Sequence, residues 1–408
     1  MLKMTTRRMV GAAVGMSLMT GGQAGDALER HGEYLSRAGN CMGCHTRPGG
    51  EPFAGGVRFV TPFGILYSTN ITPDSSTGLG DWSDEDFLRA MHEGVRPDGE
   101  HLYPAFPYTA YTLLSREDVL AIKAYLDTQP AVDYRPPPNQ GRLPFGNRTL
   151  MGPWKWLNLE QRRFDPTAYD DPQVARGAYL SEALGHCGEC HTPRTWSQGL
   201  DRDRHYAGAV QGGWAAWNIT PGPRGIGNWS QDKLINYLRN GHQRGEAVAA
   251  GPMAAVVSSS LRHLSDGDLA AMAAYLMNMP ARPGQVPARE EIQPGEPGSR
   301  DAGAELLLIS ACESCHLPNG RGVAGPYPSS FPNYSAVRDP SGRNLIKVLL
   351  HGLERQGQDR DFFMPAYRDL LTDTQIAALA TLIARRYGGH EGAFDAAEVA
   401  RLRQEAPE

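Results

Sequence analysis

Three copies of one five-residue pattern constrain this 408-residue chain more than any other feature of its sequence. The pattern Cys-x-x-Cys-His occurs at residues 41–45, 187–191 and 312–316, and it uses all six cysteines. With this spacing, two thiols attach to the vinyl groups of haem and the adjacent histidine becomes the proximal iron ligand. The sequence therefore predicts three covalently bound c-type haems. Their attachment residues are Cys41, Cys44 and His45; Cys187, Cys190 and His191; and Cys312, Cys315 and His316.

The first residues have the pattern of a secretory signal. Lys3, Arg7 and Arg8 precede a mostly apolar run at 9–19, which is too short to span a bilayer. Small residues follow, and cleavage is expected near residue 24; an uncleaved anchor is the alternative. Export would place the protein in the periplasm, where thioether attachment of haem takes place.

Composition limits the remaining classes of function. The formal charge of −5 and the pI near 6.2 give no basic surface of the kind that binds nucleic acid. Beyond the signal, no run approaches eighteen consecutive apolar residues. The mature protein is therefore expected to be soluble or peripherally attached to the periplasmic face of the inner membrane.

Each haem motif lies in a similar stretch of sequence. A short helical pattern precedes the cysteines at 32–35, 177–180 and 303–306, and a capped helix closes each stretch from Ser115, Ser265 and Thr372. This order predicts an all-α fold of three tandem class I cytochrome c-like domains, each wrapped around one haem, with the two terminal helices crossing behind it.

The repeats and linkers give expected boundaries for every part of the chain. The proline run at 136–138 opens an extended linker, and the tail is expected to be polar, with a weak amphipathic helix near 394–402. The segments are a signal peptide (1–24), a first domain (25–135), a linker (136–171), a second domain (172–284), a linker (285–299), a third domain (300–390) and a tail (391–408).

The first two stretches share two further blocks of sequence. Asn-Ile-Thr-Pro occurs at 70–73 and 218–221, and a Gly-x-Gly-x-Trp-Ser block at 78–83 and 225–230 opens a helix. Trp82 and Trp229 in this second block could donate to a haem propionate or pack in the core.

The first linker is unusually aromatic for a connector. Residues 143–157 contain Trp154 and Trp156 among several apolar residues. Two interpretations remain open: the segment packs over two haem domains, or it is a surface for a quinone, a membrane or a partner.

An electron-transfer haem needs a sixth ligand, commonly methionine. Met253 and Met364 each precede a closing helix at similar positions and are the predicted distal ligands of the second and third haems. The first stretch has Phe106 at this place, and phenylalanine cannot bind iron.

Three nearby residues could replace the missing methionine. Met91 aligns with Leu238 on an apolar helix face and is expected in the core, and His92 is expected to be solvated. His101, just before the 102–108 loop, is the weakly favoured ligand. A five-coordinate iron is a comparable alternative, and a catalytic haem would need that open position.

Together with the three haem motifs, the blocks Leu-Tyr-Pro-Ala-x-Pro-Tyr (102–108), Gly-Pro-Met (251–253) and Met-Pro-Ala (364–366) resemble one family closely. It comprises the triheme cytochrome c subunits of membrane-associated bacterial dehydrogenases acting on alcohol, gluconate, sorbitol or fructose. Many relatives carry the axial methionine at the position of Phe106, so the resemblance does not supply a ligand there.

The resemblance implies an electron-transfer subunit. A separate dehydrogenase subunit (flavin, pyrroloquinoline quinone or molybdenum dependent) would oxidise an alcohol, sugar or aldehyde, and the haems would pass electrons to ubiquinone or a terminal oxidase. The residues show no nucleotide-binding fingerprint or nucleophile triad. Two alternatives remain: a self-contained, peroxidase-like haem enzyme that uses an open first haem, and a free periplasmic electron shuttle.

Overall fold

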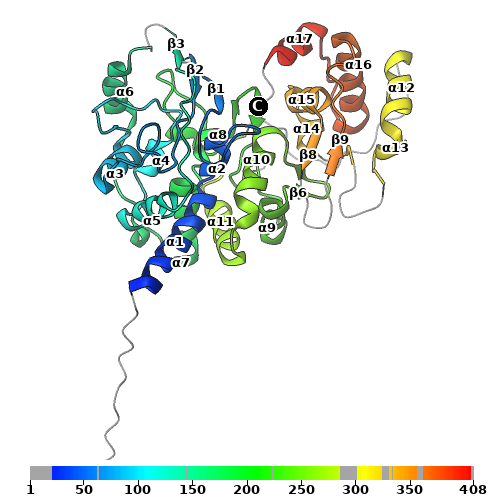
Figure 1. The fold of residues 1–408 in the computed structure, drawn as a ribbon. Coiled ribbons are helices and arrows are strands. Elements are labelled where there is room, and N and C mark those ends of the chain that lie inside the picture. The colour runs from blue at the N-terminus through cyan, green and yellow to red at the C-terminus, as the bar shows by residue number, and fades with distance from the viewer. Residues whose placement is uncertain are drawn as a thin grey trace, which may run out of the picture.

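The computed structural model describes residues 21–61, 64–142, 146–222, 225–284, 301–323, 330–332, 334–355 and 362–405. We call the parts of the chain around the first, second and third Cys-x-x-Cys-His motifs the first, second and third units. Figure 1 shows the blue-to-cyan first unit beside the green second unit, with the yellow-to-red third unit on the far side of the second. The predicted signal peptide lies almost wholly outside the described residues.

Helices are the longest regular elements of the first unit, and a small antiparallel sheet of order β1-β2-β3 lies above the first motif in Figure 1. Its elements are α1 (Gly21–Ala38), α2 (Cys41–His45), β1 (Arg58–Thr61), β2 (Gly64–Tyr67), α3 (Asp84–Glu93), α4 (Tyr108–Tyr111), α5 (Arg116–Asp127) and β3 (Gln140–Gly141). In register, Arg58 pairs with Tyr67 and Ile65 with Gln140.

The linker contains short helices, and the second unit repeats the helical order of the first. The linker elements are η1 (Arg148–Leu150), α6 (Met151–Asn158) and η2 (Pro166–Ala168). The second unit has α7 (Pro172–Ala178), η3 (Tyr179–Leu184), α8 (Gly188–His191), η4 (Arg202–Arg204), β4 (Ala209–Gln211), β5 (Trp214–Ala216), α9 (Gln231–Asn240), β6 (His242–Gln243), β7 (Ala247–Val248), α10 (Gly251–Ser259), η5 (Leu261–His263) and α11 (Asp266–Asn278).

The third unit is also mainly helical. Its elements are α12 (Ala302–Leu307), η6 (Leu308–Cys312), α13 (Glu313–His316), α14 (Ser335–Arg338), α15 (Arg343–His351), β8 (Leu353–Arg355), β9 (Phe362–Met364), α16 (Asp373–Ile383), η7 (Ala384–Gly388) and α17 (Ala396–Gln404). In the predicted tail, α17 is the expected helix, and its Val399 and Leu402 are fully buried in the third core. A stripe of apolar residues at helical spacing therefore makes most of this tail part of the third unit.

All three closing helices begin at the predicted caps. The side chains of Ser115, Ser265 and Thr372 accept from the backbone N–H three residues on, at the starts of α5, α11 and α16. Of these three, Thr372 forms the full reciprocal capping box, because the Gln375 side chain also accepts from the Thr372 backbone N–H. At the same position in the other two units, the side chains of Asp118 and Asp268 instead accept from tyrosine hydroxyls of the neighbouring unit.

The opening and closing helices of the first two units cross at glycine. A Cβ added to Gly32 in α1 would lie 1.8 Å from the Ala121 carbonyl oxygen of α5, and one added to Gly177 in α7 would lie 1.9 Å from that of Ala271 in α11. No other residue allows backbones to approach this closely. The predicted crossing of the terminal helices is thereby confirmed in these two units.

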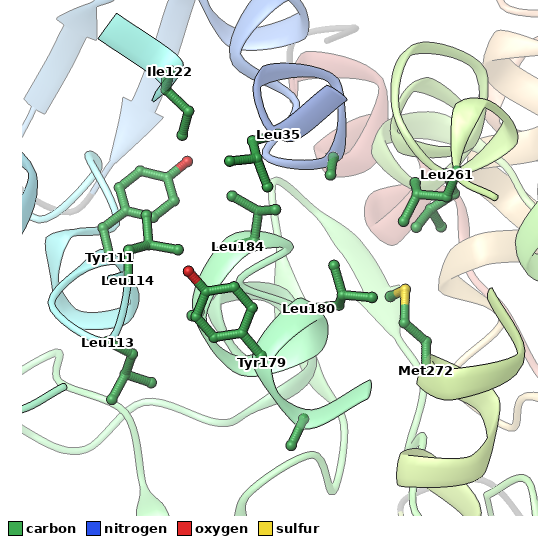
Figure 2. Packing of buried hydrophobic residues seen from close by; sticks show 14 of the residues in the cluster. Leu35, Tyr111, Leu113, Leu114, Ile122, Tyr179, Leu180, Leu184, Leu261 and Met272 are labelled. Carbon is green, nitrogen blue, oxygen red and sulfur yellow. The ribbon is translucent and has the colours of Figure 1, made fainter. Parts of the chain in front are cut away.

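The first and second units share one apolar core. Leu35 and Ile122 of the first unit belong to the same buried cluster as Leu180 and Met272 of the second, and Figure 2 shows these side chains converging from both units. The third unit has a core of its own, built on α15, α16 and α17. The first two units are therefore packed as one body.

A reciprocal pair of tyrosines joins the first two units at the edge of this core. The Tyr34 hydroxyl of α1 donates to Asp268 of α11 (2.6 Å) and accepts from the Ser265 N–H. The Tyr179 hydroxyl donates to Asp118 of α5 (2.5 Å) and accepts from the Ser115 N–H (3.2 Å). Tyr34 and Tyr179 occupy the same position in the two repeats. Each binds the start of the closing helix of the other unit.

Each aspartate also has a partner in its own unit. His31 lies 2.8 Å from Asp118, and Arg176 donates twice to Asp268. Burial acts to raise the pKa of Asp268, but the hydrogen bonds from Arg176 and Tyr34 outweigh it and hold that pKa below its usual range. The carboxylate is therefore ionised wherever the protein is folded near neutral pH.

The third unit lacks both halves of this arrangement. Glu305 stands at the position of the tyrosine and pairs with Arg386 inside its own unit, while Gln375 replaces the aspartate and caps its own helix. Contacts between the second and third units are partly polar and partly apolar: Val248 of the second unit packs against the third core, and the Trp214 ring lies beside Lys347. Asn344 exchanges two hydrogen bonds with the backbone of Ala215, and His242 lies 2.7 Å from the Tyr334 hydroxyl.

Among the described residues, we find no helix with the length and apolar character needed to cross a bilayer.

Replacing Gly32 by alanine is expected to lower the free energy of unfolding by about 2 kcal/mol or more, because the new methyl group would overlap the Ala121 carbonyl. Gly303→Ala is the matched control. There the nearest atom to an added Cβ is a carboxylate oxygen of Asp301, at 3.2 Å, and the change should lie within about 1 kcal/mol of neutral. Chemical denaturation followed by circular dichroism measures both; equal losses would contradict the close helix crossing.

Tyr34→Phe and Tyr179→Phe should each destabilise the joined units by about 1–3 kcal/mol, because each removes one hydrogen bond to a carboxylate and the acceptor of a backbone N–H. All seven tryptophans lie between residues 82 and 229, so tryptophan fluorescence during denaturation reports on these two units and their linker. Tyr367→Phe is the control, since that hydroxyl donates to the Ala311 carbonyl within the third unit. A fluorescence transition unmoved by either interface variant would show that the tyrosine pair does not hold the units together.

Candidate haem-binding sites

Each Cys-x-x-Cys-His motif forms a short helical turn. In α2 this turn contains Cys41, Cys44 and His45, and α8 and α13 carry the ends of the second and third motifs. Residues three and four apart lie on one face of a helix. The turn therefore presents two sulfur atoms and one imidazole to the same side, and no disulfide joins any of the six cysteines.

The imidazoles of the first two motifs are oriented by backbone carbonyls. His45 Nδ1 lies 2.7 Å from the Thr69 carbonyl oxygen, and His191 Nδ1 lies 2.6 Å from that of Trp217. A carbonyl only accepts, so Nδ1 carries the proton and Nε2 keeps its lone pair for a metal. Burial lowers the pKa of both histidines, which keeps the rings neutral.

The Asn-Ile-Thr-Pro blocks hold these carbonyls in place. Asn70 directly follows Thr69, is only 2 % exposed, and accepts from the Thr72 N–H and hydroxyl. Its amide donates to the Val132 carbonyl beyond the closing helix. Asn218 makes the same turn with Thr220 and donates to the Arg282 carbonyl.

This supporting role was not predicted from the sequence. The signal was present in the repeated block, which starts 25 and 27 residues after His45 and His191. The sequence gives no geometry that would connect the block to the histidine, because the connecting group is a backbone carbonyl.

The third motif has a different setting. The His316 ring stacks on Phe331, with centroids 3.9 Å apart and an interplanar angle of 9°, and Phe331 stacks in turn on Tyr387. The Tyr387 hydroxyl donates to the Pro318 carbonyl, two residues beyond His316. Aromatic packing thus surrounds this imidazole, in a unit that lacks the Asn-Ile-Thr-Pro block.

The predicted distal methionines lie beside the two cores. Met253 is in the first turn of α10 and packs, half-buried, against the shared core of the first two units. Met364 ends β9 and packs against the third core. Their assignment as iron ligands stays a prediction.

In the first unit, Phe106 is half-buried and packs edge-on against Tyr111, with centroids 5.3 Å apart. Met91 is 5 % exposed in the shared core, as expected for a core residue.

His101 faces the linker helix. Its Nδ1 accepts from the Lys155 ammonium (2.9 Å), and Arg148 donates to its backbone carbonyl. A Cβ added to Gly152 of α6 would lie 3.2 Å from His101 Nε2, so both ring nitrogens are close to the linker. Its assignment as the sixth ligand stays a prediction.

The chain is similar to several known cytochrome c proteins. Residues 30–130 match the family model for cytochrome c. The gluconate 2-dehydrogenase cytochrome c subunit of Pantoea cypripedii is 37 % identical over 94 % of this chain and 91 % of its own length. The fructose dehydrogenase cytochrome subunit of Gluconobacter japonicus is 36 % identical, over 91 % of this chain and 82 % of that protein.

The chain belongs to the family of dehydrogenase cytochrome c subunits. Its function is electron transfer, the function of this family. The chain also matches a nicotinate dehydrogenase subunit of Pseudomonas putida, at 39 % identity over 92 % of this chain, but spans only 32 % of that longer protein.

The residues of this cytochrome subunit fit the haem c that the family implies. Paired cysteines and a neutral imidazole with an available Nε2 are the donor set that covalent haem requires. Apolar side chains such as Leu35, Leu180 and Met272 form the core behind the first two motifs. These surroundings would exclude water from the macrocycle.

His92 corrects one expectation about the first unit of the cytochrome subunit. It was expected to be solvated, but it is 5 % exposed, and its Nδ1 accepts from Arg163 at 2.7 Å. Arg163 belongs to the linker, which passes back over the first unit at this point. It therefore covers His92 of α3, a position that the sequence pattern alone places at the surface. Burial and the Arg163 charge lower the pKa of His92 to about 4.

This low pKa predicts loss of stability in acid. Between pH 6.5 and 4 the unfolded chain binds a proton at this histidine that the folded protein does not, so stability falls as the pH is lowered through this window, by up to about 3 kcal/mol. His92→Asn retains an acceptor for Arg163 and cannot titrate, so its stability should fall less. Denaturation curves at pH 4.5 to 7.5 measure both proteins; parallel losses would contradict the assignment.

Proposed function

We propose that the protein is a triheme electron-transfer subunit that carries electrons from a partner dehydrogenase to ubiquinone or a terminal oxidase. The observation that supports it most directly is that all three Cys-x-x-Cys-His motifs end in the same helical turn. Each turn would hold one haem c, so that the three units correspond to three tandem cytochrome c domains with the boundaries given by the sequence, except that the third extends through α17.

The residues of the protein have defined tasks in this function. The cysteines would tether the macrocycle, and His45, His191 and His316 would bind iron through Nε2. The Thr69 and Trp217 carbonyls hold the first two rings in the neutral tautomer. Met253 and Met364 would complete the second and third sites, where sulfur favours ferrous iron and raises the potential. Haem supplies the redox change.

The relatives support the proposed partner, and the signal pattern at the start of the sequence supports the proposed location. Proteins named as gluconate and fructose dehydrogenase cytochrome subunits align over nearly the whole chain. We therefore propose a dehydrogenase partner that oxidises an alcohol, sugar or aldehyde, and a periplasmic location after cleavage of the signal near residue 24.

One observation favours a second candidate. Phe106 occupies the place of the first distal methionine, and its ring packs against Tyr111 rather than supplying a donor atom. An iron left with an open sixth position could bind a small ligand, as a peroxidase-like enzyme requires.

Carbon monoxide counts the open haems, and peroxide turnover separates the two candidates. In the electron-transfer subunit the second and third ferrous haems should not bind it, so binding should not exceed one per chain, and peroxide should not be turned over. Rapid peroxide turnover would instead establish the enzyme. Cys41→Ser with Cys44→Ser should reduce the haem count from three to two by intact-protein mass spectrometry.

A redox titration of Phe106→Met tests the first site directly. The wild-type protein should show one midpoint potential clearly different from the other two, and the new sulfur ligand should move that potential upward and abolish carbon monoxide binding. Met91→Leu is the control, because that methionine is a core residue and its loss should leave all potentials in place. Three similar wild-type potentials would contradict a distinct first haem.

A further inference from the structure

Two tryptophan side chains stand out from the surface on neighbouring segments. Trp156 of α6 is 87 % exposed and Trp196 of the loop after α8 is 89 % exposed, more than any other large apolar side chain in the described part of the chain. Leu157 and Leu150 beside Trp156 are 52 % and 39 % exposed. Large apolar side chains exposed together in this way mark an interaction site.

The segments that carry the two indoles are fastened to each other. Trp154 Nε1 donates to the Ser197 carbonyl at 2.7 Å, and the Ser197 hydroxyl donates to Asn158 at 2.9 Å. Arg202 and Glu160 form an ion pair across the same junction. We call these two segments, residues 146–163 and 194–204, the Trp156–Trp196 surface.

The other side of α6 is anchored in the protein. Met151 is fully buried against Leu66 and Tyr103, and the Lys155 ammonium donates to the Gly94 carbonyl. Trp156 and Leu157 therefore project outward because the helix is held by its opposite face. Their exposure follows from the packing of the linker and is present in a structured helix.

This surface is basic although the chain as a whole is acidic. Its 29 residues contain seven lysines and arginines against three carboxylates, whereas the whole chain has a formal charge of −5. Lys155 is buried, and Arg148 and Arg194 pair with Glu100 and Glu189 outside these segments, so the excess of positive charge at the exposed face is smaller than this count. The side chains of Arg162, Arg202 and Arg204 are each more than half exposed, the first two sharing Glu160 as an ion-pair partner and the third pairing with Asp201. Anionic lipid headgroups attract clustered basic residues at about 1 kcal/mol per residue close to the membrane.

We infer that the Trp156–Trp196 surface docks on the interface of an anionic lipid bilayer. Indoles partition to the boundary between headgroups and acyl chains, and a bilayer accepts a protruding ring without a shaped pocket. The basic excess then provides the complementary charge. A protein partner is the other possible occupant, and the experiment below distinguishes it.

The inference rests on the proposed function and adds to it which units would face the membrane. The surface spans the first two units: Lys155 contacts Gly94 of the first, and Trp196 lies five residues after His191 of the second. Docking would therefore turn the first two haem sites toward the membrane, where a lipid-soluble quinone could be reduced. The third unit would remain on the far side of the second, available to another protein.

Vesicle binding of the complete, haem-loaded protein tests the inference. The N-terminus of the purified protein is first read by mass spectrometry, because the apolar run at 9–19 would itself bind lipid if retained. Vesicles of phosphatidylglycerol with phosphatidylethanolamine should bind the protein, vesicles of phosphatidylcholine should bind it far less, and salt should weaken the binding. Trp156→Ser with Trp196→Ser should reduce the affinity at least about tenfold.

Leu370→Ser is the matched control, since Leu370 is 73 % exposed in the third unit and should not contribute. Absent vesicle binding by the wild type, or equal binding by the double variant, would overturn the inference. So would a double variant that binds vesicles normally but no longer co-purifies with the dehydrogenase, which would make the surface a protein interface. Haem content and reduction by the dehydrogenase, measured on the same samples, report separately on the proposed function.

Discussion

The orientation of the proximal imidazole is the constraint on which each of the first two sites depends. His45 and His191 each use Nδ1 to bind a carbonyl 24 or 26 residues further along the chain. Those carbonyls stay in place because buried asparagines tie them to segments beyond the closing helices, at Val132 and Arg282. The tautomer of each histidine and the closure of its unit therefore depend on one connected set of hydrogen bonds. Haem coordination and folding should for this reason support each other.

Small differences between the repeats determine how the units assemble. In the first two units, a tyrosine two residues after the crossing glycine meets an aspartate that would otherwise cap its own helix. The exchange is symmetrical, and it lies at the edge of a continuous apolar core. In the third unit, Glu305 and Gln375 both find partners within the unit, so this unit has no equivalent group with which to join the pair. Two substitutions thus distinguish the pair that shares one core from a third unit with a core of its own.

Much of the fold could be predicted from the sequence, and the rest could not for physical reasons. Motifs and caps are local, so the three helical turns and the starts at Ser115, Ser265 and Thr372 were predicted. The burial of His92 was not, because it depends on Arg163 returning from a linker about seventy residues away. The tyrosine exchange was also missed: a repeat shows that two tyrosines are equivalent, but not that each bonds to the other unit. The linker packs against both units, through Met151 on the first and Trp154 on the second, yet it leaves Trp156 exposed. A pattern of apolar residues alone could not divide the segment into these faces, because an eight-residue helix offers too few turns to define a stripe.

The exceptional first site cannot be isolated from the second. Tyr111 packs edge-on against Phe106 on one side and against His186, directly before Cys187, on the other, at centroid distances of 5.3 and 5.7 Å. Side chains that belong to the shared core therefore form the wall between the two attachment segments. Charges interact strongly across a dry, apolar wall because neither water nor salt screens them there. In the proposed triheme protein, a change of oxidation state at the first iron would therefore shift the potential of the second, whereas the third site lies in a unit with a core of its own. A ligand difference at Phe106 should accordingly be felt most at the first haem, to a smaller extent at the second, and least at the third.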